Sequence, residues 1–116
     1  VWGTGSVRRE FLHVDDAADG LVLLMERYSD EQIINLGTGV DVSIMDLVHL
    51  VRDVVGFRGQ IQFDPTRPDG TPRKVTDVSR LSALGWKARI PLQRGLEETY
   101  RWYVNNLSAE KRRAVA

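Results

Sequence analysis

The sequence REFLHVDDAADGLVLLM, residues 9–25, contains a strand pattern and a helix pattern in direct succession. Its first part, residues 9–14, sets apolar side chains among polar neighbours, which predicts a short strand that leads to a turn. Beyond the turn, apolar residues recur at helical spacing and predict a helix with one apolar face. Asp15 or Asp16 is the expected N-cap of that helix. A strand followed by an amphipathic helix indicates an α/β chain.

The remainder of the chain continues this alternation of short elements. Ser43 and Asp46 have the spacing of a capping box, and the apolar residues that follow keep a helical period as far as Gly56. We expect Trp86 to pack back onto the body of the protein. The further expected elements are a buried strand at 33–36, a helix over 43–56, a short strand at 60–63, a helical turn at 79–84 and a final helix over about 91–106. Pattern alone therefore predicts an α/β fold of short strands with three longer helices.

Composition is that of an ordinary globular protein. The chain has 116 residues, of which 42% are hydrophobic and 28% are charged, enough for one modest core. Its 16 basic residues balance its 16 acidic residues, so overall charge favours neither nucleic acid nor an anionic membrane as a partner. Apolar runs are far shorter than the roughly 20 residues that span a bilayer. The absence of cysteine excludes disulfides and thiolate metal sites, and we expect a reducing, cytoplasmic setting.

The boundaries of the chain suggest how it is organised. It begins at Val1-Trp2 without an initiator methionine, from which we expect it to be a fragment. We expect residues 1–106 to form one domain. Residues 107–116 are polar and rich in basic side chains, and we expect them to be a frayed tail.

Several motifs that could carry chemistry fail on inspection. Both Gly-Thr-Gly turns lack the third small residue of a dinucleotide fingerprint, because Arg8 and Val42 occupy that position. No tyrosine is followed four residues later by lysine, so the usual reductase acid is missing. The group of His13, Asp15 and Asp16 is better explained by capping and the helix dipole than by a metal. We therefore assign no catalytic, cofactor-binding or metal-binding residue.

Two polar segments remain, residues 2–9 and 67–74. In the first, Arg8 and Arg9 follow a glycine-rich turn and can present guanidinium groups to a phosphate. In the second, prolines flank Asp69-Gly70-Thr71 and restrict the backbone, which lowers the entropic cost of ordering the loop around a ligand. Together the two segments outline an anion clamp. The alternative, that these are solvated charges on surface loops, stays open on residue type alone.

The same segments carry a resemblance to a known family. WGTGSVRREFLHVDD at 2–16 and PDGTPRK at 68–74 together resemble the GDP-L-fucose synthases of the extended short-chain dehydrogenase/reductase family. NLGTG at 35–39 and DVSRLSALGW at 77–86 are shared more loosely across nucleotide-sugar enzymes of that extended family. The resemblance covers nearly the whole chain, from Trp2 to about Asn106. Ser6-Val7 departs from the Thr-Pro of many members and alters the stiffness of the turn more than its chemistry.

The resemblance implies a fold and an activity. The chain would be the small C-terminal, substrate-binding lobe of a Rossmann-type enzyme, with pieces that complete the edge of the parent sheet. The parent would convert GDP-4-keto-6-deoxy-D-mannose to GDP-L-fucose by 3,5-epimerisation and NADPH-dependent 4-reduction. The catalytic Ser, Tyr and Lys and most of the NADP(H) site would lie in the N-terminal Rossmann half. The fragment alone would then be inactive, and its parent a homodimer.

Four residues match family positions that contact the GDP-sugar. The resemblance implies that Arg9 pairs with the pyrophosphate and that Lys74 adds a second cation beside it. Trp2 would offer a flat face to sugar or base. Asp69 would accept hydrogen bonds from a hydroxyl or from the guanine edge.

Two alternatives to this assignment stay open. The chain could be the substrate domain of another extended-family nucleotide-sugar epimerase or dehydratase, which would prefer a different nucleotide such as UDP. It could also be a non-catalytic nucleotide-sugar-binding module that has kept the fold, for which Arg9 and Lys74 would be incidental.

Overall fold

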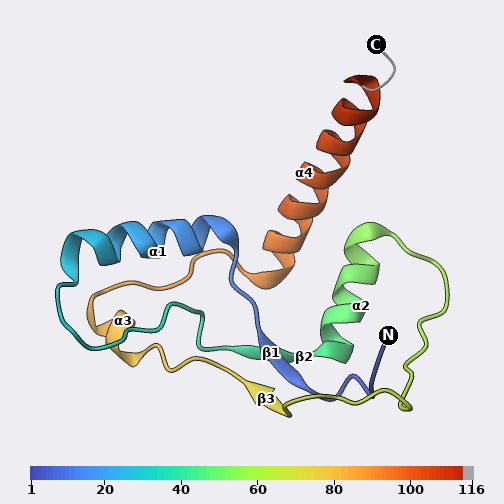
Figure 1. Cartoon of the computed structure of the whole chain (residues 1–116). Helices are drawn as coiled ribbons and strands as arrows, with labels where there is room; N and C mark the ends of the chain where they lie inside the picture. The colour runs from blue at the N-terminus through green and yellow to red at the C-terminus, as the bar shows by residue number, and fades with distance from the viewer. Residues whose placement is uncertain (114–116) are drawn as a thin grey trace.

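The computed structural model describes the backbone of residues 1–113 and the side chains of residues 1–107. It confirms a small α/β fold of short strands and helices (Figure 1). The elements in chain order are β1 (Arg8–Glu10), α1 (Val14–Arg27), β2 (Asp41–Ser43), α2 (Ile44–Val55), β3 (Arg73–Lys74), α3 (Ser79–Ala83) and α4 (Leu92–Arg113). The two helices predicted after the first strand and after Ser43 are both present.

The three strands form one small sheet in the order β2-β1-β3. β1 pairs antiparallel with β2 and parallel with β3, so segments more than 60 residues apart lie side by side. In the parallel pair, Arg8 is the register partner of Arg73, and Arg9 is the register partner of Lys74. The sheet therefore joins the two polar segments that the sequence singled out.

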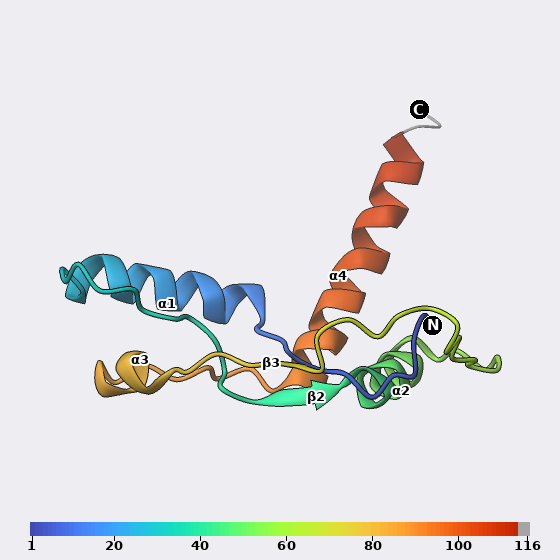
Figure 2. The same ribbon diagram turned by 60° about the horizontal axis from the view of Figure 1, so that its bottom comes forward.

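The helices leave an open molecule. Figures 1 and 2 show α1 and α4 extending away from the sheet in different directions. The radius of gyration is 17.7 Å, whereas a compact chain of this length has about 13 Å. The accessible surface is 8834 Å², roughly 2,400 Å² more than a compact monomer of this size exposes. Among the described side chains, the buried hydrophobic residues are Leu81 and Trp86.

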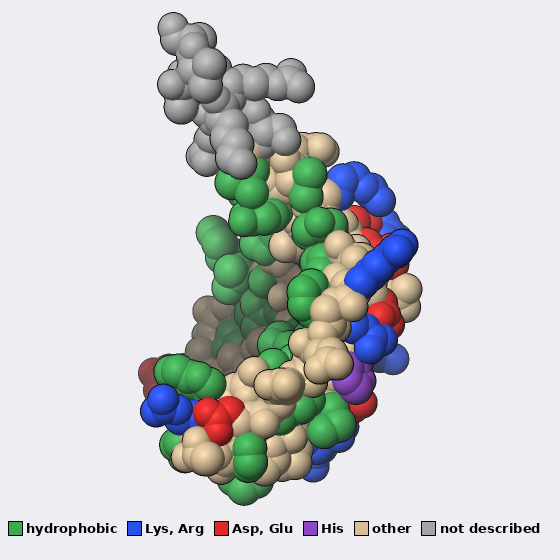
Figure 3. All heavy atoms as spheres, turned by 90° about the vertical axis from the view of Figure 1, so that its right-hand side faces the viewer, with side chains coloured by type: hydrophobic (Ala, Val, Ile, Leu, Met, Phe, Trp, Pro, Cys, Tyr) green, Lys and Arg blue, Asp and Glu red, His purple; other side chains and the backbone are tan. Residues whose placement is uncertain are grey.

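Much apolar surface is therefore uncovered. On one side of the molecule, hydrophobic side chains gather in a hollow, while charged side chains line a neighbouring edge (Figure 3). Exposed large hydrophobic residues occur on α1 and on α4: Val14, Leu21, Val22, Met25, Trp102, Tyr103 and Val104. No helix within the described residues is long and apolar enough to cross a membrane.

Two predicted strands are absent from the described structure. Residues 33–36 are not in a strand, and Ile33 is 87% exposed instead of buried. Residues 60–63 also form no strand, and only an isolated bridge between Asp64 and Trp2 follows them. A strand requires a neighbour to complete its hydrogen-bond ladder, and no strand of the described chain lies beside residues 33–36. Residues 62–64 bond to the backbone of Val1 and Gly3, a contact too short to count as a strand.

The start of α1 differs from the prediction. Its N-cap is His13, whose Nδ1 accepts a hydrogen bond from the Asp15 amide at 3.3 Å. Asp16 is only 3% exposed and accepts hydrogen bonds from the backbone amides of Arg89 at 3.0 Å and Ile90 at 2.8 Å. The carboxylate predicted as a cap therefore ties α1 to the segment that precedes α4.

The predicted ends of α2 are confirmed. Ser43 is the N-cap and accepts from the Asp46 amide at 3.0 Å, and Gly56 closes the helix with a left-handed φ of 70°. Trp86 packs back as expected, with 5% exposure and a 3.0 Å hydrogen bond from its indole nitrogen to Asp19. α4 runs to Arg113 and not to Asn106, so most of the expected tail is helical. Whether this end frays stays a prediction, and residues 114–116 lie outside the described residues.

Replacing Asp16 by alanine is expected to destabilise the protein. Asp16→Ala leaves two backbone amides without an acceptor in a buried place, which costs on the order of 1 to 3 kcal/mol of unfolding free energy. Glu26→Ala is the matched control, because this acidic residue lies at an exposed position near the other end of α1. The control should change stability by less than about 0.5 kcal/mol. Urea unfolding followed by circular dichroism measures both, and equal effects would contradict the buried tie.

Candidate functional site

The parallel pair of β1 and β3 sorts four cationic side chains onto two faces. Successive side chains on a strand point to opposite faces of a sheet. Arg8 and Arg73 are register partners on one face, and Arg9 and Lys74 are register partners on the other. The site therefore begins with two pairs of like charges on adjacent strands.

Asp41 of β2 neutralises the first pair. Its carboxylate accepts a 2.8 Å hydrogen bond from Arg8 Nε and forms a second ion pair with Arg73. The Asp41 side chain is 5% exposed. Arg73, and then Arg8, hold the pKa of the Asp41 carboxyl below its usual value although burial acts to raise it. Arg8, which the sequence offered as a phosphate ligand, is thus paired with Asp41.

The second pair has no such partner. Within the described residues, neither Arg9 nor Lys74 forms an ion pair, and one Arg9 amino group donates to the Arg8 carbonyl at 2.7 Å. Both residues line an open pocket of about 680 Å³. The other residues of its lining are Glu10, Leu12, Leu36, Gly37, Arg73, Val75 and Thr76. Glu10 also lines this pocket, but its carboxylate is engaged by Thr38, Gly39 and Thr76. Arg9 and Lys74 are therefore the groups that suit an anionic ligand with more than one charged oxygen.

The loop before β1 and the loop before β3 are held together by Asp69. Its carboxylate accepts from the Thr4 amide and from the Thr4 hydroxyl, each at 2.7 Å. These bonds, the hydroxyl first, hold the pKa of Asp69 below its usual value. A side chain at Gly3, where φ is 82°, would collide with the same carboxylate. Asp69 therefore closes the two loops on each other.

Trp2 lies at the outer end of this pair of loops. Its side chain is 76% exposed, and the guanidinium of Arg67 stands 5.2 Å from the ring centroid. The Gly3 amide donates to the Asp64 carbonyl at 2.9 Å, which holds the backbone beside Trp2 against the second loop. One face of the indole is thus fixed by a cation in a cation–π contact.

The two polar segments predicted to form a clamp do fold against each other. Arg9 and Lys74 share one pocket, Asp69 joins the loops, and an Arg9 amino group lies 3.8 Å from where a side chain at Gly70 would begin. The binding roles of Trp2, Arg9, Asp69 and Lys74 stay predictions. No cluster of three metal-ligating side chains occurs among the described residues.

Sequence reasoning missed two carboxylates in this site, Asp41 and Glu10. Glu10 accepts from the Thr76 amide at 2.6 Å, the Thr76 hydroxyl at 2.7 Å and the Gly39 amide at 2.7 Å, and it also bonds Thr38. The alternation Arg8-Arg9-Glu10 was the available signal, since it puts Glu10 on the face opposite Arg9. The partners of both acids lie 28 or more residues away and were not deducible from it.

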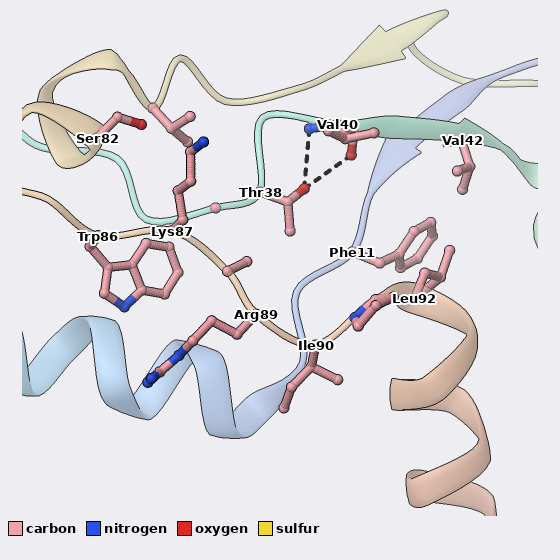
Figure 4. Close-up of a pocket in the computed structure, with 14 residues that line it drawn as sticks. Phe11, Thr38, Val40, Val42, Ser82, Trp86, Lys87, Arg89, Ile90 and Leu92 are labelled. Atoms are coloured by element: carbon pink, nitrogen blue, oxygen red, sulfur yellow. Dashed lines mark hydrogen bonds between the residues drawn. The ribbon is translucent and has the colours of Figure 1, made fainter.

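A second cavity, of about 430 Å³, lies between the 37–42 segment and the chain before α4. Figure 4 shows Phe11, Trp86 and Ile90 among its lining. The Arg89 side chain extends toward α1, where it pairs with Asp19 at 2.8 Å. None of the four predicted binding residues lines this cavity, and its wall is mainly apolar, so it suits packing better than a diphosphate.

The Asp41 ion pairs predict a pH-dependent stability difference. Because the folded-state pKa of Asp41 is lowered, its contribution is present above the unfolded value of about 3.9 and is lost as pH falls through the lower folded value. Asp41→Asn should therefore lower the melting temperature by a few degrees near neutral pH and by less below about pH 4. The control is Asp53→Asn, at a carboxylate that is 63% exposed. A pH-independent difference for Asp41→Asn would contradict this account.

Comparison with known proteins finds relatives among nucleotide-sugar enzymes. Residues 1–37 match the NAD dependent epimerase/dehydratase family. The chain is 52% identical to probable GDP-L-fucose synthase 1 of Oryza sativa subsp. japonica, over 97% of this chain and 34% of that protein. It is 45% identical to GDP-L-fucose synthase of Escherichia coli K12, over 91% of this chain and 36% of that protein. The chain thus spans about a third of the length of these relatives.

A solved structure agrees with the sequence match. The GDP-L-fucose synthetase of Naegleria fowleri bound to NADP superposes with a TM-score of 0.87 at 28% identity, over 93% of this chain and 35% of that chain. The predicted resemblance to the GDP-L-fucose synthases of the extended short-chain dehydrogenase/reductase family is thereby confirmed over nearly the whole chain, in sequence and in fold.

Proposed function

We propose that this chain is the nucleotide-sugar-binding part of a GDP-L-fucose synthase. The complete enzyme would convert GDP-4-keto-6-deoxy-D-mannose to GDP-L-fucose by 3,5-epimerisation and NADPH-dependent 4-reduction. The observation that carries the proposal is the register that sets Arg9 beside Lys74 on the face that Asp41 does not neutralise. The match to relatives that bear this name supports the choice of sugar nucleotide.

This part of the enzyme binds the nucleotide and orients the sugar. Arg9 and Lys74 bind the diphosphate through charge-assisted hydrogen bonds, and the exposed face of Trp2 stacks against sugar or base. The Asp69 carboxylate uses part of its acceptor capacity on Thr4, and its remaining lone pairs accept from a hydroxyl or the guanine edge. Holding the nucleotide in this way orients the 4-keto group for reaction in the other half of the enzyme.

The other half of the enzyme is the proposed partner of the exposed apolar surface. An N-terminal Rossmann half would cover α1 and pair with residues 33–36, whose exposure marks a strand without a neighbour. That half would hold the NADP(H) and the catalytic Ser, Tyr and Lys, and its helices would form the homodimer. The cofactor supplies the hydride of the reduction when bound, and no residue of this chain is assigned to hold it.

Nucleotide preference tests this proposal. We expect a hybrid enzyme, with this chain replacing the matching 36% of the E. coli GDP-L-fucose synthase, to bind GDP at least tenfold more tightly than UDP. The physical reason is that the guanine edge offers Asp69 donors that uracil lacks. Calorimetry measures both affinities, and turnover of the keto sugar follows as NADPH oxidation. Tighter binding of UDP would replace the proposal by a UDP-sugar epimerase or dehydratase.

Removing Arg9 is expected to weaken the grip on the diphosphate. Loss of a charge-assisted pair costs about 1.5 to 3 kcal/mol, so Arg9→Ala should raise the Kd for GDP by tenfold or more in the hybrid enzyme. Lys74→Ala should act in the same direction. Arg58→Ala removes an exposed arginine outside the clamp and should change the affinity by less than about twofold. A Kd for Arg9→Ala within about twofold of the parent would favour a non-catalytic module.

A further inference from the structure

The Glu10 carboxylate connects its own strand to two other segments of the chain. One carboxylate oxygen bonds Thr38 and accepts from the Gly39 amide at 2.7 Å. The other oxygen accepts from the Thr76 amide at 2.6 Å and from the Thr76 hydroxyl at 2.7 Å. The carboxylate therefore joins β1 to the turn at 37–39 and to the chain that follows β3.

The surroundings of Glu10 are built for an ionised acceptor. All of these contacts are N–H or O–H donors, and a side chain at Gly37 would collide with both the Glu10 carboxylate and the Thr76 hydroxyl. Partial burial acts to raise the pKa of the Glu10 carboxyl, but the bonds from Thr76, Gly39 and Thr38 outweigh it and lower that pKa. The absence of a side chain at Gly37 thus leaves the space that the Glu10 carboxylate and the Thr76 hydroxyl occupy.

The hydrogen bonds between Glu10 and Thr76 lie next to Arg9 and Lys74 in the chain. Glu10 directly follows Arg9, and Thr76 lies two residues after Lys74. β3 has only two residues paired with β1, so the ladder by itself fixes the second strand weakly. The bonds from Thr76 to Glu10 clamp the chain immediately beyond the two cations. They therefore reinforce the pairing of β1 with β3 just beyond Arg9 and Lys74, as Asp41 does through Arg8 and Arg73.

We propose that Glu10 is a positioning residue for binding of the diphosphate. Its carboxylate is engaged by Thr38, Gly39 and Thr76, and it acts by holding Lys74 beside Arg9 in the register that lets both reach one diphosphate. The inference rests on the proposed function, because it concerns the same anion grip. It also links that grip to the 37–39 turn, which follows the segment proposed to join the Rossmann sheet.

A double-mutant cycle separates positioning from a merely structural role. Glu10→Gln replaces one acceptor oxygen by a donor that faces N–H groups, and it should raise the Kd for GDP by about fivefold or more in the hybrid enzyme. In the Arg9→Ala/Lys74→Ala background the same change should alter the Kd by less than about twofold, because no cation pair is left to misalign. Asp53→Asn on α2, where the side chain is 63% exposed, is the matched control and should have no effect.

The outcomes are distinct. The positioning role is overturned if Glu10→Gln lowers GDP affinity equally with and without Arg9 and Lys74. It is also overturned if Glu10→Gln causes no loss of affinity in the otherwise unmodified hybrid. Failure of the unmodified hybrid to bind GDP overturns the proposed function instead. If circular dichroism shows that Glu10→Gln does not fold, Thr76→Val removes a single hydroxyl donor to Glu10 and takes its place in the cycle. It should raise the Kd about twofold to threefold with Arg9 and Lys74 present and leave it unchanged without them.

Discussion

The parallel pairing of β1 with β3 is the constraint on which the rest of the site depends. It gathers four cations on two adjacent strands, where side chains stand about 5 Å apart. Like charges on neighbouring strands repel one another. Asp41 relieves the repulsion on one face only. On the other face Arg9 and Lys74 form no ion pair among the described residues, an arrangement that suits a ligand with several charged oxygens better than a single acceptor.

The sequence predicts the parts of this fold that are determined locally. The caps of α2 were found because Ser43 and Gly56 act within a few residues of themselves. The strand expected at 33–36 was not found, because a strand depends on a neighbour that no local pattern supplies. Asp16 was misassigned for a related reason. An aspartate at a helix start serves equally as a cap or as a distant tie, and only the packing of Arg89 and Ile90 decides between them.

In the candidate site, too, the sequence predicts local features and misses those that depend on distant contacts. The residue types of the clamp were visible in the loops 2–9 and 67–74, and prolines and glycines marked both loops as preorganised. Which arginines are free was not visible, because it depends on the strand register and on Asp41, more than 30 residues from either partner. Alternation along β1 then assigns Arg8 to the face that carries Asp41 and Arg9 to the pocket.

The exposed apolar surface and the candidate anion pocket lie on different elements of the chain. Its excess surface of roughly 2,400 Å² lies in the range of permanent interfaces, and exposed apolar residues on α1 and α4 contribute to it. The cations occupy β1 and β3, so a partner that covers the helices need not cover the anion pocket. The two functions still have to be held in one geometry, since a misplacement of about 1 Å between grip and chemistry costs rate. The Glu10 carboxylate, which bonds both the turn after residues 33–36 and the chain after β3, connects the wall of the anion pocket to the segment beside α1.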